Sequence, residues 1–206
     1  MNSYLTRFFL LLTAASSLVA CREDSKLPAP TTESIPLIIP EINPQKSFYD
    51  IISAKPSTNA LAAQGLTRPV FEFVVNPSQG YSEIQTVEVY KSYRRDLRLG
   101  PRVKVMDLTS FPATVTINSQ DALRGLYATS PVTGQAAPQP VLGETSAIIN
   151  RVFNGEAIVF TFEYVMKDGR RITLTPLSTT SGSVGAPQGT FVNAPYAAIA
   201  EIRPPN

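Results

Sequence analysis

The clearest pattern in the sequence is an alternation of apolar and polar residues along short segments, which is typical of half-buried β-strands. It is strongest from Glu156 to Met166, where every second side chain is large and apolar. Asp168-Gly169 then predicts a tight turn, since glycine tolerates positive φ. Arg171 to Leu177 is expected to pair back on this strand and to end at an edge, because Pro176 cannot donate a backbone hydrogen bond.

Further strands are predicted on both sides of this hairpin. Val87 and Val89 lie on one face of the segment from Ile84 to Arg94, and we expect a hairpin between this segment and Val103 to Leu108. The residues predicted on its opposite face are Thr86, Glu88, Tyr90 and Ser92. The other predicted strands are Val70 to Val75, Ala113 to Ile117 and a last one within Phe191 to Ile202. Ser119 is expected to cap a short helical turn that runs to Leu126, and Tyr127 to Ser146 is expected to be a long loop.

About seven short strands, few helices and frequent turn residues predict an all-β protein with an immunoglobulin-like β-sandwich. The domain is expected to span residues 47–202 with its core at about 70–177, followed by a short tail at 203–206. The chain has a single cysteine, so this sandwich has no disulfide between its sheets.

The N-terminal part predicts an export signal and a tether. Residues 1–20 combine the basic Arg7 with an apolar run from Phe8 to Ala15, which is too short to span a membrane. Residues 21–46 are rich in proline, which favours an extended, semi-rigid tether. Within it, Leu37-Ile38-Ile39 could form a first edge strand, and residues 47–53 after it predict either a helical turn or a docking segment.

Leu18-Val19-Ala20-Cys21 resembles a bacterial lipobox. This resemblance implies that the Cys21 thiol is acylated and that the protein is held at a membrane through its lipid. The next three residues, Arg22, Glu23 and Asp24, resemble the export signal of Bacteroidetes surface lipoproteins, which implies display on the outer membrane. The alternatives are an ordinary signal peptide with a chance cysteine and a tether with unrelated charges.

Composition argues against several classes of function. The net charge is only +2, so no strong electrostatic field favours nucleic acid. The sequence has no histidine, which excludes a Ser-His-Asp triad and a histidine-based metal site within it. We therefore expect a protein that is not an enzyme and has no metal or other cofactor.

The densest charged feature is a basic cluster with tyrosines beside it. Its candidate ligand-binding residues are Tyr90, Tyr93, Arg94, Arg95 and Arg98, and the cluster also contains Lys91, Arg102 and Lys104. The basic side chains could hold an acidic glycan or a partner's acidic loop, and the tyrosines could stack on sugar rings. The alternatives are a solvated hairpin end that protects a sheet edge, and tyrosines that fill gaps between strands.

The strand and turn patterns from about residue 70 to 177, together with the leader, resemble a group of uncharacterised Bacteroidetes lipoproteins with an immunoglobulin-like domain. The segments that carry the resemblance are Val87 to Tyr93, Thr109 to Ile117, Phe160 to Tyr164 and Asp168-Gly169-Arg170. Such proteins are often found beside SusC/SusD-type nutrient importers, so the resemblance implies an accessory role in capturing glycans or other nutrients. The alternative is a structural or adhesion lipoprotein that pairs with a partner through a sheet edge.

Overall fold

The computed structural model describes residues 36–55, 58–78, 83–95, 98–128, 139–141, 152–173 and 196–205. All of them belong to one folded unit, Ile35–Asn206. Cys21, Arg22, Glu23 and Asp24 lie outside the described residues, as do the predicted signal peptide and the first part of the predicted tether. The described unit is mostly β-strand, as the sequence predicts, and its few helices are short.

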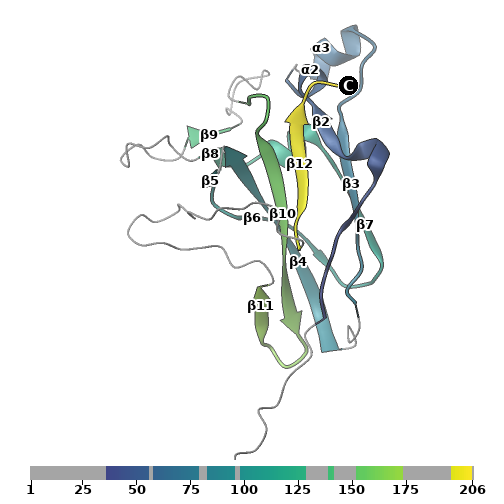
Figure 1. The fold of residues 1–206 in the computed structure, drawn as a ribbon, viewed down its shortest axis with the longest axis vertical. Helices are drawn as coiled ribbons and strands as arrows, with labels where there is room; N and C mark the ends of the chain where they lie inside the picture. The colour runs from purple at the N-terminus through teal and green to yellow at the C-terminus, as the bar shows by residue number, and fades with distance from the viewer. Residues whose placement is uncertain are drawn as a thin grey trace, which may run out of the picture. The chain divides into compact units, whose positions relative to one another are not determined.

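The larger sheet has seven strands and is built around two long antiparallel ones, β4 (Ile84–Arg95) and β10 (Ala157–Met166). Its main path runs β2 (Phe48–Asp50), β12 (Ala198–Arg203), β10, β4 and β5 (Arg98–Leu99). Two further strands join this path, β11 (Arg171–Thr173) beside β10 and β6 (Val103–Leu108) beside β4. Figure 1 shows β4 and β10 crossing the centre of the unit.

The smaller sheet has three strands in the order β1 (Glu41–Ile42), β3 (Val70–Val75) and β7 (Ala113–Asn118). A separate two-stranded pair joins β8 (Tyr127–Ala128) to β9 (Gln139–Pro140). The short helices are η1 (Pro44–Lys46), α2 (Ile51–Ala54), α3 (Thr58–Ala63) and α4 (Ser119–Leu123). None of the helices in the described ranges is long and apolar enough to cross a membrane.

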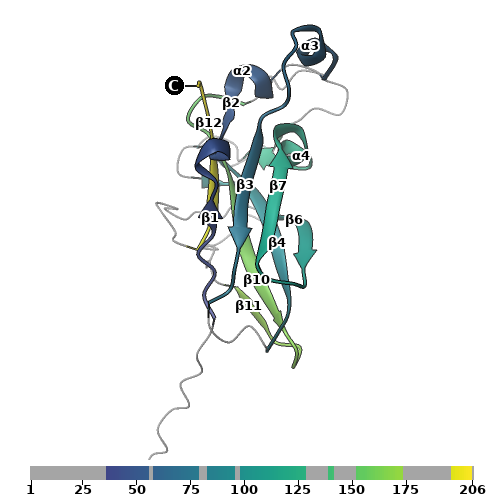
Figure 2. The ribbon, with the colours of Figure 1, turned by 90° about the vertical axis from the view of Figure 1, so that its right-hand side faces the viewer.

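The two sheets pack face to face through aromatic side chains. Phe71 and Phe73 of β3 contact Phe160 of β10, with ring centroids 5.7 and 5.3 Å apart, and the rings of Phe71 and Phe160 are stacked. Phe162 of β10 meets Phe73 edge-on. All four rings are fully buried, and Figure 2 shows β3 and β7 in front of β4 and β10. This core explains why every second residue of β10 must be large and apolar.

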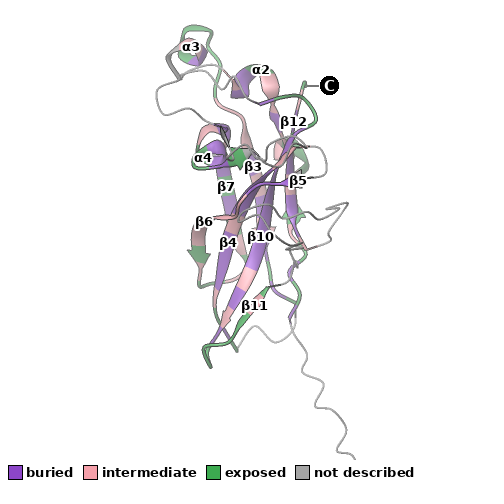
Figure 3. Ribbon diagram, turned by 90° about the vertical axis from the view of Figure 1, so that its left-hand side faces the viewer, coloured by how far each residue is buried: buried purple, intermediate pink, exposed green. Residues whose placement is uncertain are grey.

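The larger sheet is covered on both faces along part of its length. Beyond the main core, Val159 on the other face of β10 packs with Leu99 and Ala197 in a second, smaller cluster. Figure 3 shows the resulting buried stretches of β4 and β10. The expectation that the β4 segment is half-buried is therefore wrong in part, because Glu88 and Ser92 on its second face are also buried.

Most predicted strands are confirmed, with small changes at their ends. The predicted β4–β6 hairpin pairs as expected, and the turn after β10 has Gly169 at φ +86°. The predicted helical turn forms as α4, but its N-cap is Asn118, whose side chain accepts a hydrogen bond from the Asp121 N–H. Within the predicted loop 127–146, β8 pairs with β9. Residues 129–138 and 142–146 of that loop lie outside the described residues, as do residues 147–151 and 191–195.

The segment from Pro36 to Lys46, which the sequence assigns to the tether, is part of the folded unit. Ile38 is fully buried, and its bridge partner is Pro77. The backbone of β1 pairs with β3, and the Tyr164 hydroxyl donates to the Pro36 carbonyl. Residues 47–53 form β2 and then the start of α2, so they contribute both a strand and a helical turn. The domain therefore begins before residue 47, because these apolar side chains complete the core.

Candidate functional site

Four side chains of the basic cluster are dispersed in the structure and paired with acidic residues. The Arg94 guanidinium lies 4.0 Å from the Glu201 carboxylate, and Arg95 Nε donates to Glu156. On the same sheet, Arg102 is 3.4 Å from Glu163. Lys104 pairs with both Glu88 and Asp107. Arg98 lies in β5, and its side chain is outside the described residues.

Neither candidate tyrosine presents an open ring. Tyr93 is fully buried, and its hydroxyl donates to Glu156, so the expectation that its ring stacks on sugar is wrong. Burial raises the pKa of Tyr93, which therefore stays protonated. Tyr90 is half-buried, and the Arg102 guanidinium lies 4.0 Å from its ring centroid. Arg102 thus covers one face of the Tyr90 ring, which sequence analysis proposed for stacking on a sugar.

Two glutamates lie opposite each other on the face of the larger sheet that points away from the main core. Glu88 of β4 is directly opposite Glu163 of β10, and Arg171 donates hydrogen bonds to both carboxylates. Hydrogen bonds from Lys104 and Tyr90 lower the pKa of Glu88 to about 2. A general acid in glycoside cleavage needs a raised pKa, so Glu88 is not suited to that role. This pair serves to hold β4, β10 and β11 together.

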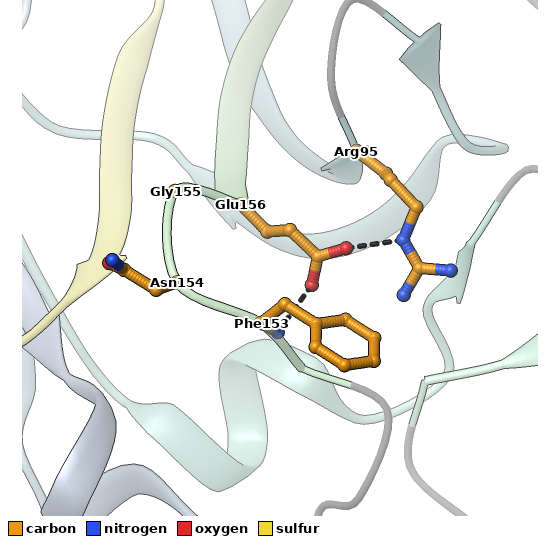
Figure 4. A pocket seen from close by; sticks show the side chains of 5 residues that line it. All are labelled: Arg95, Phe153, Asn154, Gly155 and Glu156. Carbon is orange, nitrogen blue, oxygen red and sulfur yellow. Dashed lines mark hydrogen bonds and ion pairs between the residues drawn. The ribbon is translucent and has the colours of Figure 1, made fainter.

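An open hollow lies at one end of the larger sheet, where β4 ends and β10 begins. Its volume is about 360 Å³, and it is lined by Arg95 and the turn Phe153 to Glu156. Gly155 has φ +87°, a conformation that favours glycine, and its N–H donates to the Ile202 carbonyl at 2.9 Å. The turn is therefore fixed to β12 on one side. Figure 4 shows Arg95 and Phe153 on the same side of the Glu156 carboxylate, with the Asn154 side chain pointing away.

Glu156 organises this hollow. Its side chain is buried and accepts hydrogen bonds from the Tyr93 hydroxyl, Arg95 Nε and the Phe153 backbone N–H, the last at 2.7 Å. One carboxylate thus fixes a strand end, a core tyrosine and the backbone of the turn. Because these three donors come from two separated segments of chain, the positions of Arg95 and Phe153 relative to each other are set in advance of any ligand.

The Phe153 ring is the exposed apolar element of the hollow. It is 55% exposed, although it follows the fully buried Val152. The Arg95 guanidinium carbon lies 5.3 Å and Lys55 Nζ lies 6.0 Å from its ring centroid. A flat aromatic face with nearby hydrogen-bond donors can stack on a sugar ring and orient its hydroxyl groups.

The structure thus retains Arg95 from the predicted site and adds Phe153 and Glu156, which sequence analysis did not select. A usable signal was present, because Phe153 stands directly before Asn154-Gly155, a turn dipeptide, and a large aromatic residue beside a turn is placed where exposure is common. Glu156 could not be selected in this way, since its partners Tyr93 and Arg95 are about sixty residues away.

Lys91 is buried on the core face of β4, opposite Phe160 of β10. Interpreting it as part of a solvated hairpin end is therefore wrong. Its ammonium group donates to the backbone carbonyls of Asp121 and Arg124 at 2.6 and 2.7 Å, which ties the sheet to the end of α4. Burial lowers the pKa of Lys91 to about 8.

We expect Lys91 to make stability depend on pH. Between pH 8 and about 10.4, folded Lys91 has lost its proton while the unfolded chain still holds it, so the free energy of unfolding rises with pH. The rise is at most ~1.4 kcal/mol per pH unit. Urea unfolding at pH 8.0, 8.5 and 9.0 measures it, where a tyrosine with its ordinary pKa of about 10 is still largely protonated in the unfolded chain. Lys91→Met should abolish the rise, and an equal rise in that variant would assign it to another group.

No group of three or more His, Cys, Asp or Glu side chains in the described ranges is placed to hold a metal ion. Comparisons with protein-family models, curated proteins and solved structures found no match for this chain. The function is therefore argued from the site itself.

Proposed function

We propose that this chain is a lipid-anchored, non-catalytic protein of the outer-membrane surface that captures glycans or other nutrients for a SusC/SusD-type importer. The lipobox-like sequence ending in Cys21 and the acidic signal after Arg22 support the anchor and its display on the surface. The two packed sheets are compatible with an immunoglobulin-like sandwich, which we propose for the folded unit. Such a unit would act as a rigid carrier for one binding site.

The observation that carries the proposed binding role is the exposed Phe153 ring beside the prearranged Arg95–Glu156 pair. The ring belongs to a fixed turn rather than to a core strand. Its exposure therefore takes no large apolar side chain away from the packing of the core. Stacking on the ring gives affinity for the apolar face of a sugar. Hydrogen bonds from the neighbouring guanidinium to the sugar hydroxyl groups fix its orientation.

The place of the hollow in the unit also suits a tethered binding protein. The chain enters the described unit at Pro36, beside Tyr164 near the end of β10, whereas the hollow adjoins Glu156 before its start. Eight residues of strand separate these points, which corresponds to roughly 27 Å. The hollow thus lies at the opposite end of β10 from the point at which the described chain begins.

The test is a glycan-array screen of soluble protein Ser25–Asn206, which keeps every described residue and so the whole core. We expect binding that persists at physiological salt and is reduced at least ten-fold in Phe153→Ala. Tyr127→Ala is the matched control, because Tyr127 is also an exposed aromatic residue, at 41%, but does not line the hollow. Absence of any binding, or equal binding by Phe153→Ala, would contradict glycan capture at this site.

One observation favours the second candidate, a structural or adhesion protein. Among the described strands, β7 pairs only with β3, and Thr114 and Thr116 are exposed along it. An uncharged edge strand of this kind can accept a strand from a partner. Capture of the same outer-membrane protein by wild type and Phe153→Ala, without glycan binding, would favour this role.

A further inference from the structure

Two cations from different segments lie near the Phe153 ring, which lines the hollow. Lys55 follows α2, and Arg95 ends β4, yet both lie within 6.0 Å of the Phe153 ring centroid. The attraction between a cation and the face of an aromatic ring stabilises each contact, but it does not neutralise the charge. The ring therefore has positive charge close to it, although the sequence as a whole is almost neutral.

Two carboxylates of the turn and of the helix beside these cations, Glu156 and Asp50, are already occupied. Glu156 accepts hydrogen bonds from three donors, of which Arg95 is one. Asp50, at the other end of α2 from Lys55, caps that helix by accepting from the backbone N–H groups of Ile52 and Ser53 and from the Ser53 hydroxyl. In the ranges that the structure describes, the Lys55 ammonium has no hydrogen bond or ion pair with a carboxylate. Among the described side chains beside the Phe153 ring, the Lys55 charge is therefore not paired with a carboxylate.

We propose that the hollow binds a sugar acid, with the ring of a uronate stacked on Phe153 and its carboxylate held by Lys55 and Arg95. This inference rests on the proposed glycan-binding function and specifies its ligand class. A neutral sugar would use the ring but leave the Lys55 charge uncompensated, whereas a simple carboxylate would use the charge but not the ring. A uronate satisfies both because its carboxylate is attached to a pyranose ring with an apolar face.

The uncharged counterpart of a uronate is its methyl ester, which keeps the ring and every hydroxyl group. We therefore compare a galacturonic acid trisaccharide with its fully methyl-esterified form, by isothermal titration calorimetry on protein Ser25–Asn206 at 150 mM salt. Wild type should bind the acid at least ten-fold more tightly than the ester. Lys55→Met should remove this preference while leaving the affinity for the ester unchanged. Phe153→Ala should weaken the binding of both.

The matched control is Lys167→Met, since Lys167 is an exposed lysine just after β10, at the end of the sheet away from the hollow. It should keep the full preference for the acid, which shows that the effect is local and not a change in net charge. Lys55→Gln is the second variant and should behave as Lys55→Met does.

The outcomes separate the two proposals. Equal affinity of wild type for acid and ester, with both lost in Phe153→Ala, would overturn the uronate assignment and leave glycan binding in place. A preference for the acid that survives in both Lys55 variants would also overturn it. If neither trisaccharide binds, the uronate assignment fails, and the glycan array then decides whether the wider proposal fails with it.

Discussion

Phe160→Ala is expected to lower the free energy of unfolding by about 4 kcal/mol. Phe160 is fully buried and contacts the rings of Phe71 and Phe73, so it joins the two sheets at their centre. Its removal takes away a large buried apolar surface and leaves a cavity that a two-sheet core cannot close without moving a strand. Chemical unfolding followed by circular dichroism measures the change.

Phe153→Ala is the matched control for this prediction, since it makes the same substitution at a ring that is 55% exposed. We expect it to cost less than about 1 kcal/mol, because little apolar surface leaves the core and only exposed cation–π contacts are lost. Similar losses in the two variants would show that Phe160 is not the residue that joins the sheets. The control also establishes that weaker glycan binding by Phe153→Ala does not arise from unfolding.

Glu156→Ala is expected to destabilise the protein by about 3 kcal/mol. The substitution leaves the fully buried Tyr93 hydroxyl without its acceptor and leaves Arg95, whose side chain is 26% exposed, without its carboxylate. The Phe153 N–H also loses its partner, so the turn should become mobile. Urea unfolding reports the stability, and hydrogen exchange of the Phe153 amide reports the loosening of the turn.

Glu201→Ala is the control for Glu156→Ala. The Glu201 side chain is 56% exposed and only 4.0 Å from Arg94, so the pair contributes no more than ~0.5 kcal/mol. If the two glutamate variants lost the same stability, Glu156 would not be the centre of a buried network. The comparison thus separates a buried carboxylate from a surface one in the same sheet.

The sequence predicts the strands because one face of each is buried and its apolar residues recur at every second position. The same periodicity also places Lys91 and Tyr93 on the core face, since they alternate in step with Val87 and Val89, and the structure has all four on that face. Both were interpreted as surface residues because their side chains end in a polar group. Lys91 can be buried only because two backbone carbonyls of a helix end receive its ammonium group, and no local pattern predicts that contact.

The candidate site was predictable only in part for a similar reason. Arg95 was selected from the basic cluster, but its position depends on Glu156, which is far away in sequence and adjacent in space. The folded segment from Pro36 to Lys46 was assigned to the tether because its prolines favour extended chain. An extended chain can also pack against a sheet, as Ile38 and β1 do.

The measurement that tests the central claim most directly is an amide NMR titration of isotopically labelled Ser25–Asn206 with the glycan that binds best on the array. Binding at the hollow predicts the largest shift changes at Arg95 and from Phe153 to Glu156, with little change around Glu88 and Arg171 on the outer face of the sheet. The largest changes around Glu88 and Arg171, or no changes at saturating glycan, would contradict the assignment of the hollow as the binding site.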